Sequence, residues 1–392
     1  MHRILGLLVS TGCLLPVFAS SFAGGTIEGD TRLLYFDTKK SNSKGSALGL
    51  GLTPSFKSGE LTSGLKAEIG FGVSVPVTEN EKGIGSTAAI GRKNSNGNSE
   101  LYLVPTLLNI EYTKDGKQVV IGAQDLETPL IGSDDIRLIR NTFTAVMGRY
   151  EVNDALALHG GHILSMAGAV DGLAKDPQFF HAMSDQSTIA KVDDKGVSTL
   201  SLVYAKEQWS TQAWFYSMSE ASKDSGATTA LYADIGKTWE KVKASGQVIH
   251  QSNKLNKYTS IGLQLEAVFG DIGIIAALNT FSMDDELVGG TPSYYGWGGY
   301  PEYAVADELW ANVANWDGGS ATKLAASYSG VEKLSFGVGV IDFSDVAMGI
   351  DFVIGYSVND KVGVSFVAES VDFDQKGVDN SRILKFMTNY SF

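Results

Sequence analysis

Residues 125–142 combine carboxylates and guanidinium groups in a segment that lacks the alternation of a β-strand. Where such opposed charges face each other across a narrow water-filled path, they determine which ions and solutes pass. The sequence equally allows an exposed loop whose charges are only hydrated. The candidate selectivity residues in this segment are Glu127, Asp134, Asp135, Arg137 and Arg140.

A second long segment, 281–320, interleaves carboxylates with aromatic residues such as Tyr294 and Trp297. Aromatic faces attract cations, and neighbouring carboxylates strengthen that attraction. A loop that packs on itself is the simpler interpretation for most of these aromatics. Carboxylate oxygens also bind Ca²⁺, but no EF-hand-like spacing is present, so we expect no cofactor and keep Ca²⁺ as a minor alternative. The candidate site residues here are Asp284, Asp285 and Glu286.

Histidine and serine offer a different chemistry. Ser165 lies close in sequence to His159 and His162, and a Ser/His pair is the centre of many hydrolase sites. No nucleophile motif surrounds Ser165, so histidines on a wall or in a loop are the better interpretation. Cys13, the only cysteine, lies in an N-terminal apolar stretch, which argues against thiolate chemistry. The sequence therefore predicts that the protein is not an enzyme, with a barrel hydrolase as the alternative.

The elements that must position these segments are strands with two unlike faces. In residues 65–75, apolar side chains alternate with Lys66, Glu68, Ser74 and glycines. A row of charges facing lipid is costly, so the apolar face must contact lipid and the polar face must line a wet interior. This explains a mean hydropathy of zero. No apolar run beyond the N-terminal stretch approaches the roughly 18 residues of a membrane helix.

About eighteen segments show this alternation. The sequence predicts an all-β fold, a transmembrane antiparallel β-barrel of about 18 strands, with 16 as the alternative because the segments near 47–54 and 143–150 are weaker. A barrel of either size is too wide for side chains to fill, so a water-filled lumen follows. The segments lie near 26–37, 47–54, 63–75, 106–113, 118–124, 143–150, 155–164, 197–205, 209–217, 228–237, 241–251, 259–268, 272–280, 321–329, 333–343, 347–357, 361–370 and 381–392.

The connections between these segments alternate in length. Every second one is short, such as 114–117, whereas the others include 76–105, 125–142, 165–196 and 281–320. Short periplasmic turns and long extracellular loops are typical of outer-membrane barrels. The register also predicts lumen-facing basic residues, which are either a cationic track for carboxylate solutes or isolated charges on a wet wall. These residues are Arg32, Lys66, Arg149, Lys243, Lys323 and Lys385.

The two ends of the chain agree with export to an outer membrane. Residues 1–23 have a basic start, an apolar stretch and small residues before Gly24, which is the pattern of a secretory signal peptide. Residues 24–392 then form one barrel domain. The last strand alternates Leu384 and Phe386 with Lys385 and ends on Phe392, as expected of a lipid-facing closing strand.

The stretch 119–143 contains Ile-Gly-Ala-Gln at 121–124, Thr-Pro at 128–129, Ser-Asp-Asp at 133–135 and Asn-Thr-Phe at 141–143. It resembles the corresponding stretch of the OprD-type outer-membrane porins, and 29–37 and 212–216 resemble two of that family's strands more weakly. The resemblance implies an eighteen-stranded barrel narrowed by its third and seventh extracellular loops, here 125–142 and 281–320. It also implies passive diffusion of small hydrophilic solutes. Arg140 stands where the family usually has proline, which predicts a mobile cation in the loop.

Charge and compartment limit the partners. The net charge of -13 argues against nucleic-acid binding and suits a channel that tolerates cations. The expected partners are the lipid bilayer of the outer membrane and small hydrophilic solutes and ions. A homotrimer is left open, because lipid and a neighbouring subunit select the same apolar residues. A surface adhesin with a structural barrel is the remaining alternative to a porin.

Overall fold

The computed structural model describes residues 24–392 apart from several connecting segments. The segments left out are 41–42, 83–89, 134–136, 168–180, 183–195, 219–226, 255–256, 284–300, 305–317, 345 and 375–379. The predicted signal peptide, 1–23, lies outside the described residues. The same holds for the candidate site residues Asp134, Asp135, Asp284, Asp285 and Glu286.

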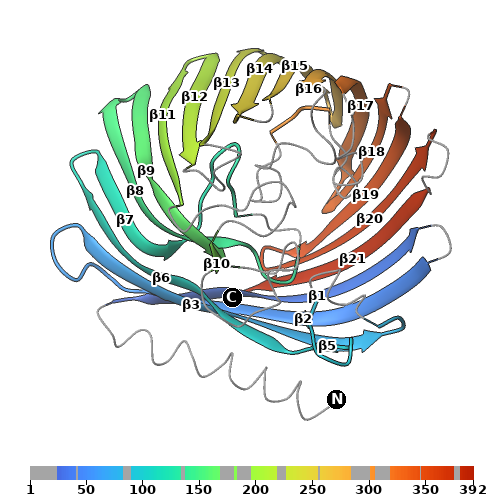
Figure 1. Ribbon diagram of the computed structural model, residues 1–392, viewed down its shortest axis with the longest axis horizontal. Helices are drawn as coiled ribbons and strands as arrows, with labels where there is room; N and C mark the ends of the chain where they lie inside the picture. Colours follow the sequence, from blue (N-terminus) through green and yellow to red (C-terminus); the bar gives the residue numbers. More distant parts are fainter. Residues whose placement is uncertain are drawn as a thin grey trace.

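Eighteen long antiparallel strands form one closed barrel, shown in Figure 1. Each long strand pairs with the next one along the chain, and β1 pairs with β21 to close the ring. The strands are β1 (Thr26–Lys40), β2 (Ser43–Lys57), β3 (Leu65–Glu79), β6 (Tyr102–Lys114), β7 (Lys117–Gln124), β8 (Thr142–Asn153), β9 (Leu156–Ala167), β11 (Val197–Lys206), β12 (Trp209–Met218), β13 (Thr228–Trp239), β14 (Val242–Ser252), β15 (Lys257–Phe269), β16 (Ile272–Met283), β17 (Gly318–Val331), β18 (Leu334–Phe343), β19 (Ala347–Asn359), β20 (Val362–Phe373) and β21 (Ser381–Ser391).

All eighteen predicted segments coincide with these strands, including the weaker ones, so the prediction of about 18 strands is confirmed and the alternative of 16 is wrong. Three further strands have two residues each. β4 (Arg92–Lys93) and β5 (Ser99–Glu100) pair with each other, and β10 (His181–Ala182) pairs with β9. No helix among the described residues is both long and apolar enough to cross a membrane.

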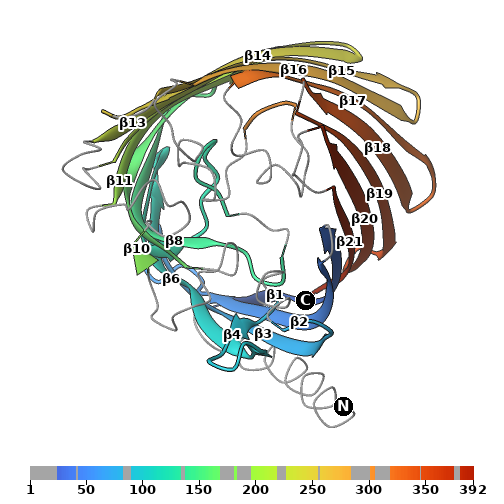
Figure 2. The same cartoon turned by 45° about the vertical axis from the view of Figure 1, so that its right-hand side comes forward.

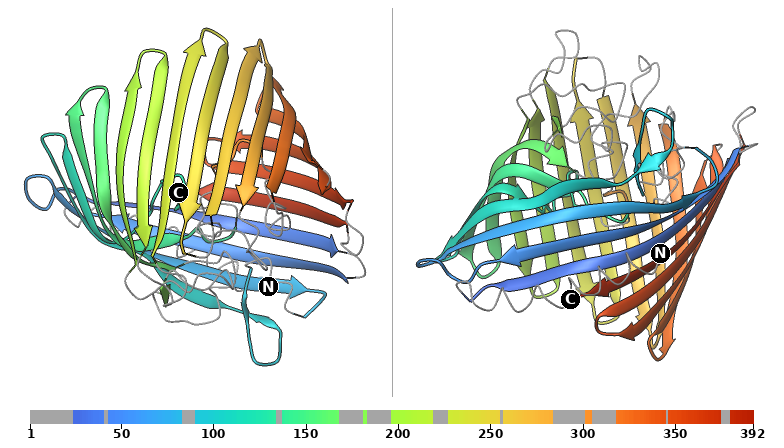
Figure 3. Two further views of the ribbon diagram at one scale, coloured as in Figure 1. Left: turned by 45° about the horizontal axis from the view of Figure 1, so that its top comes forward. Right: turned by 90° about the horizontal axis from the view of Figure 1, so that it is seen from below.

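The connections at one end of the barrel are tight. Seven of the eight contain two residues, and only the β2–β3 connection, 58–64, is longer. Between β6 and β7, Asp115 and Gly116 both have positive φ angles, 49° and 72°. A pair of positive φ angles defines the type I′ turn, whose twist matches that of the flanking strands. The strands themselves are long and tilted, as the side views in Figure 3 show.

The two faces of each strand differ as the alternation predicts. On β15, Leu263 is 61% exposed on the outside of the barrel, whereas the inward Tyr258 and Ser260 are almost fully buried. The closing strand follows the same pattern, since Leu384, Phe386 and Tyr390 are exposed and Lys385 is buried. So many exposed large apolar side chains require a cover, which for a closed barrel is lipid or a neighbouring subunit.

Candidate pore constriction

The segment that follows β7 turns into the barrel and lies within the ring of strands in Figures 1 and 2. It forms a tight turn, because the Thr128 hydroxyl donates to the Ile131 carbonyl at 2.7 Å and the Ser133 amide donates to the Leu126 carbonyl. Leu126, Leu130 and Ile131 are buried against the inner wall. The Leu130 amide also donates to the Tyr216 hydroxyl on β12 at 3.5 Å.

The later part of this segment rests on a floor of glycines. A Cβ atom on Gly51 of β2 would lie 2.8 Å from the Leu138 carbonyl oxygen, and one on Gly72 of β3 would lie 2.8 Å from the Ile139 Cγ2 atom. A Cβ atom on Gly49 would collide with Ile90 and Leu138. The missing side chains therefore let the loop approach the wall closely. We call Gly49, Gly51 and Gly72 the glycine floor.

Arg32 on β1 fixes the loop to the seam where the barrel closes. Its Nη1 group donates to the Arg137 carbonyl oxygen at 3.0 Å, and its Nε group donates to Asn389 Oδ1 on β21 at 3.1 Å. Its Nη2 atom lies 3.4 Å from Asp30 Oδ2. Arg32 faces the barrel interior and is only 6% exposed. This residue is therefore an anchor within the wall, rather than part of an open track for solutes.

The charges of the loop are partly paired. Arg140 Nη2 lies 3.1 Å from Asp125 Oδ2, so the cation predicted here is paired with a carboxylate, and its mobility stays a prediction. The Arg137 guanidinium lies over the Phe36 ring, 5.6 Å from its centre. Glu127 is exposed. Sequence reasoning missed Asp125, although it opens the same segment, because its importance comes from a contact fifteen residues along the chain.

The segment Pro301–Ala304, between β16 and β17, is anchored to the opposite wall. The Tyr258 hydroxyl donates to Glu302 Oε1 at 2.8 Å, and the Ala304 amide donates to Asn279 Oδ1 at 2.9 Å. Glu302 and Asn279 are buried. Burial, with a further contribution from the nearby Asp234, raises the pKa of Tyr303 to about 12. Both sequence-predicted loops thus have described residues inside the barrel, held by the wall.

A polar network covers the wall close to this anchor. The Gln212 amide and the Tyr232 hydroxyl both donate to Asp234 Oδ2, at 2.6 and 2.7 Å. The Trp214 indole donates to Gln212 Oε1 at 2.7 Å. The His159 and Trp214 rings lie 5.6 Å apart. These residues present carboxylate, amide and aromatic groups on the inner wall, which sequence reasoning did not single out.

The six predicted basic residues lie on the inner face but around different parts of the wall. Lys385 is buried like Arg32, and Lys66 is exposed at the turn end of β3. Arg149 pairs with Glu151 at 3.0 Å, and Lys243 with Glu266 at 3.1 Å. Lys323 on β17 is partly buried. Because Arg149 and Lys243 are paired with carboxylates, the six residues do not form a continuous row of unpaired cations. That they guide solutes stays a prediction.

The alternatives from the sequence find little geometric support in the described part of the chain. There, no three His, Cys, Asp or Glu side chains are placed to hold a metal ion, and of the carboxylates in 281–320 that were considered for Ca²⁺ only Glu302 is described. His162 is 3.0 Å from the Ser198 hydroxyl, but both residues alternate with the lumen-facing positions and lie on the outer face. Ser165 is buried.

Removing the Asp125 carboxylate should shift the ion preference of the barrel interior toward anions. The Asp125→Asn variant leaves the Arg140 guanidinium without this partner and makes the loop more positive by one charge. The reversal potential in a potassium chloride gradient should therefore shift toward anions. Asp342→Asn is the matched control, because Asp342 lies on the outer face of β18. An identical reversal potential for Asp125→Asn and the wild type would exclude Asp125 from the selectivity region.

Removing the Tyr258 hydroxyl should loosen the Pro301–Ala304 segment. In Tyr258→Phe, the buried Glu302 carboxylate loses a donor, which should cost about 1–3 kcal/mol in the free energy of unfolding. The loosened segment should also increase open-channel current noise. Tyr356→Phe, on the outer face of β19, is the matched control. Equal noise and equal stability in both variants would show that this hydrogen bond does not hold the segment.

Comparison with known proteins shows a shared fold. No model of a protein family matches the chain, and no curated protein matches its sequence. Among solved structures, Acinetobacter baumannii OccAB4 is 11% identical with a TM-score of 0.72, covering 94% of this chain and 98% of its own. Pseudomonas aeruginosa OccK9 (OpdG) is 15% identical with a TM-score of 0.74, covering 94% and 98%. Pseudomonas aeruginosa OpdK, solved with vanillate, is 15% identical with a TM-score of 0.75, covering 95% and 100%. These matches establish the same barrel architecture over nearly the full chain.

Proposed function

We propose that this chain is an OprD-type outer-membrane porin, which passes small hydrophilic solutes and ions by passive diffusion. The observation that carries the proposal is a closed barrel with two anchored loop segments in its interior. The fold shared with OccAB4 and OpdK and the sequence resemblance in 119–143 support the same family. A loop inside such a barrel limits the size of the solutes that pass by its bulk, and it determines the ion preference by its charges.

The outer membrane follows from the same features. The apolar outer face fits a bilayer, and we propose that residues 1–23 are an export signal that is removed before Gly24. The two-residue turns then face the periplasm. No cofactor is proposed. A trimer remains a proposal, and the mass of the detergent-purified protein tests it.

Planar-bilayer recording tests the channel itself. Purified, folded protein should insert in discrete conductance steps, and the reversal potential should show a weak preference for cations. Liposome swelling in small sugars and in vanillate, the ligand of the OpdK structure, would then define the solute range. Absence of stepwise conductance from folded protein would reject the porin and favour an adhesin or an enzyme on a barrel. The hydrolase alternative is weakened because Ser165 is buried, whereas His162 lies on the outer face.

A further inference from the structure

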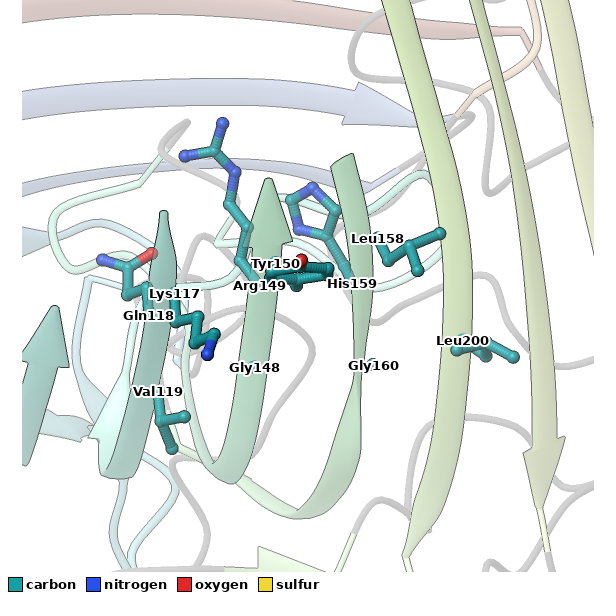
Figure 4. A pocket seen from close by; sticks show the side chains of 10 residues that line it. All are labelled: Lys117, Gln118, Val119, Gly148, Arg149, Tyr150, Leu158, His159, Gly160 and Leu200. Atoms are coloured by element: carbon teal, nitrogen blue, oxygen red, sulfur yellow. The ribbon is translucent and has the colours of Figure 1, made fainter. Parts of the chain in front are cut away.

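The outer wall of the barrel has a groove where two paired strands have glycines opposite each other. Gly148 on β8 is directly opposite Gly160 on β9, and Val119 and Leu200 occupy the flanking strands in the same row. The groove has a volume of about 530 Å³ and is lined by residues of β7, β8, β9 and β11, shown in Figure 4. A Cβ atom on Gly148 would meet nothing closer than 3.6 Å, so the groove is open.

The groove belongs to the lipid-facing side of the wall. Val119, Tyr150, Leu158 and Leu200 are exposed apolar or aromatic side chains on this side. The residues that alternate with them, Gln118, Arg149 and His159, project together to the other side of the strands in Figure 4. His159 contacts the inward, buried Trp214, which identifies that other side as the lumen. The groove therefore faces the hydrocarbon of the membrane.

Two lysines stand at the end of the groove that adjoins the β6–β7 turn. Lys114 and Lys117 are directly opposite each other in the register of the hairpin, and both are exposed. Both alternate in step with the outward Tyr112 and Val119, so they point to the membrane side. Among the described residues neither ammonium group is in an ion pair. The Lys117 ammonium lies 5.9 Å from the centre of the Tyr150 ring.

Two like charges directly opposite each other on a hairpin are destabilising unless an anion offsets them. At the edge of a membrane the available anion is a lipid phosphate, and basic residues near an anionic membrane surface are attracted to it. The apolar groove begins beside these lysines and extends toward the middle of the strands. The two lysines could thus contact the headgroup phosphate of a lipid whose acyl chain lies in the groove.

We propose that Lys114, Lys117 and the groove over Gly148 and Gly160 bind one anionic glycerophospholipid of the phosphatidylglycerol type. The phosphate lies between the two ammonium groups, and one acyl chain lies across the glycines. The site rests on the proposed function, because it requires the short turns to lie in the periplasmic, phospholipid leaflet. A second copy of the chain would cover the apolar groove, but its own exposed lysines would not neutralise Lys114 and Lys117.

Native mass spectrometry of the detergent-solubilised, folded barrel tests the proposal with added dioleoyl phosphatidylglycerol and dioleoyl phosphatidylcholine. The wild type should retain one phosphatidylglycerol in preference to phosphatidylcholine. Lys114→Gln/Lys117→Gln should weaken that binding about tenfold or more. Gly148→Leu fills the groove and should abolish lipid retention with the lysines intact. Heat-dependent gel mobility confirms that each variant is folded.

Lys333→Gln/Lys361→Gln is the matched control, because these exposed lysines lie in other two-residue turns of the same end. It should bind phosphatidylglycerol as the wild type does. Equal retention of the two lipids, or unchanged retention in Lys114→Gln/Lys117→Gln, would overturn the proposal. Oligomers that become monomers in Gly148→Leu, without a change in bound lipid, would assign the groove to a second copy instead. The readout is mass, so it is independent of whether the barrel conducts.

Discussion

Replacing Leu263 by arginine should lower the free energy of unfolding from a bilayer by about 2–4 kcal/mol. Leu263 is the central residue of β15 and is 61% exposed on the outer face, so the new guanidinium would lie near the middle of the hydrocarbon. The cost arises because the charge must either lose its hydration or draw water and headgroups toward it. Reversible guanidinium unfolding from lipid vesicles measures this difference.

The neighbouring substitution Gln264→Arg is the control for Leu263→Arg. Gln264 is the next residue of the same strand and lies on the inner face, where it is opposite Ser245 and Ala277. The same side chain would then reach water in the lumen, and the stability should change by less than about 1 kcal/mol. If Gln264→Arg were the more damaging variant, the inside and outside of β15 would have to be exchanged.

The Arg32→Ala variant should lower the free energy of unfolding by about 3 kcal/mol, the lower end of the range for removing one partner of a buried ion pair, because Asp30 is only partly buried. The variant loses the hydrogen bonds from Arg32 to Asn389 and to the Arg137 carbonyl. The Asp30 carboxylate still accepts hydrogen bonds from Asn389 and, at 2.7 Å, from Ser391. These remaining donors limit the penalty on the Asp30 carboxylate. Loss of the loop anchor should also make single-channel currents noisier. Unfolding from vesicles and bilayer recording measure the two effects.

Two further variants distinguish the loss of the hydrogen bonds of Arg32 from the loss of its charge. Arg382→Ala removes an exposed guanidinium on the outer face of β21 and should change stability by less than about 0.5 kcal/mol. Arg32→Lys keeps the charge but lacks the planar fork that reaches both acceptors, so it should restore only part of the stability. A quiet, fully stable Arg32→Ala channel would mean that the loop does not depend on this residue.

The strands could be predicted because a barrel in lipid enforces alternation on its outer face. The alternation is weaker in 47–54 and 143–150 because the inner faces of these two strands contact buried protein segments. The inward positions of β2 include Gly49 and Gly51, which must lack side chains to admit Leu138. The inward positions of β8 include Phe143 and Ala145, which are buried inside the barrel and therefore apolar. In both strands the inner face meets protein rather than water, so the polar half of the alternation is lost.

The candidate site was predictable only in outline. The lack of alternation identified 125–142 and 281–320 as unusual segments, and residues of both lie inside the barrel. The contacts that hold them, Arg32 with Asn389 and Tyr258 with Glu302, join positions far apart in sequence. No local pattern encodes such pairs. For the same reason the sequence suggested Arg32 as a solute-guiding charge, although its burial makes it an anchor.

The position of Arg32 links the calibre of the pore to the order of assembly. Arg32 belongs to the first strand, while its partner Asn389 belongs to the last. Until β21 arrives, the guanidinium that binds the loop lacks the acceptor that orients it from the other side of the seam. A barrel that is still open at this seam therefore has an incompletely anchored loop. Closure of the wall and attachment of the loop thus depend on the same side chain.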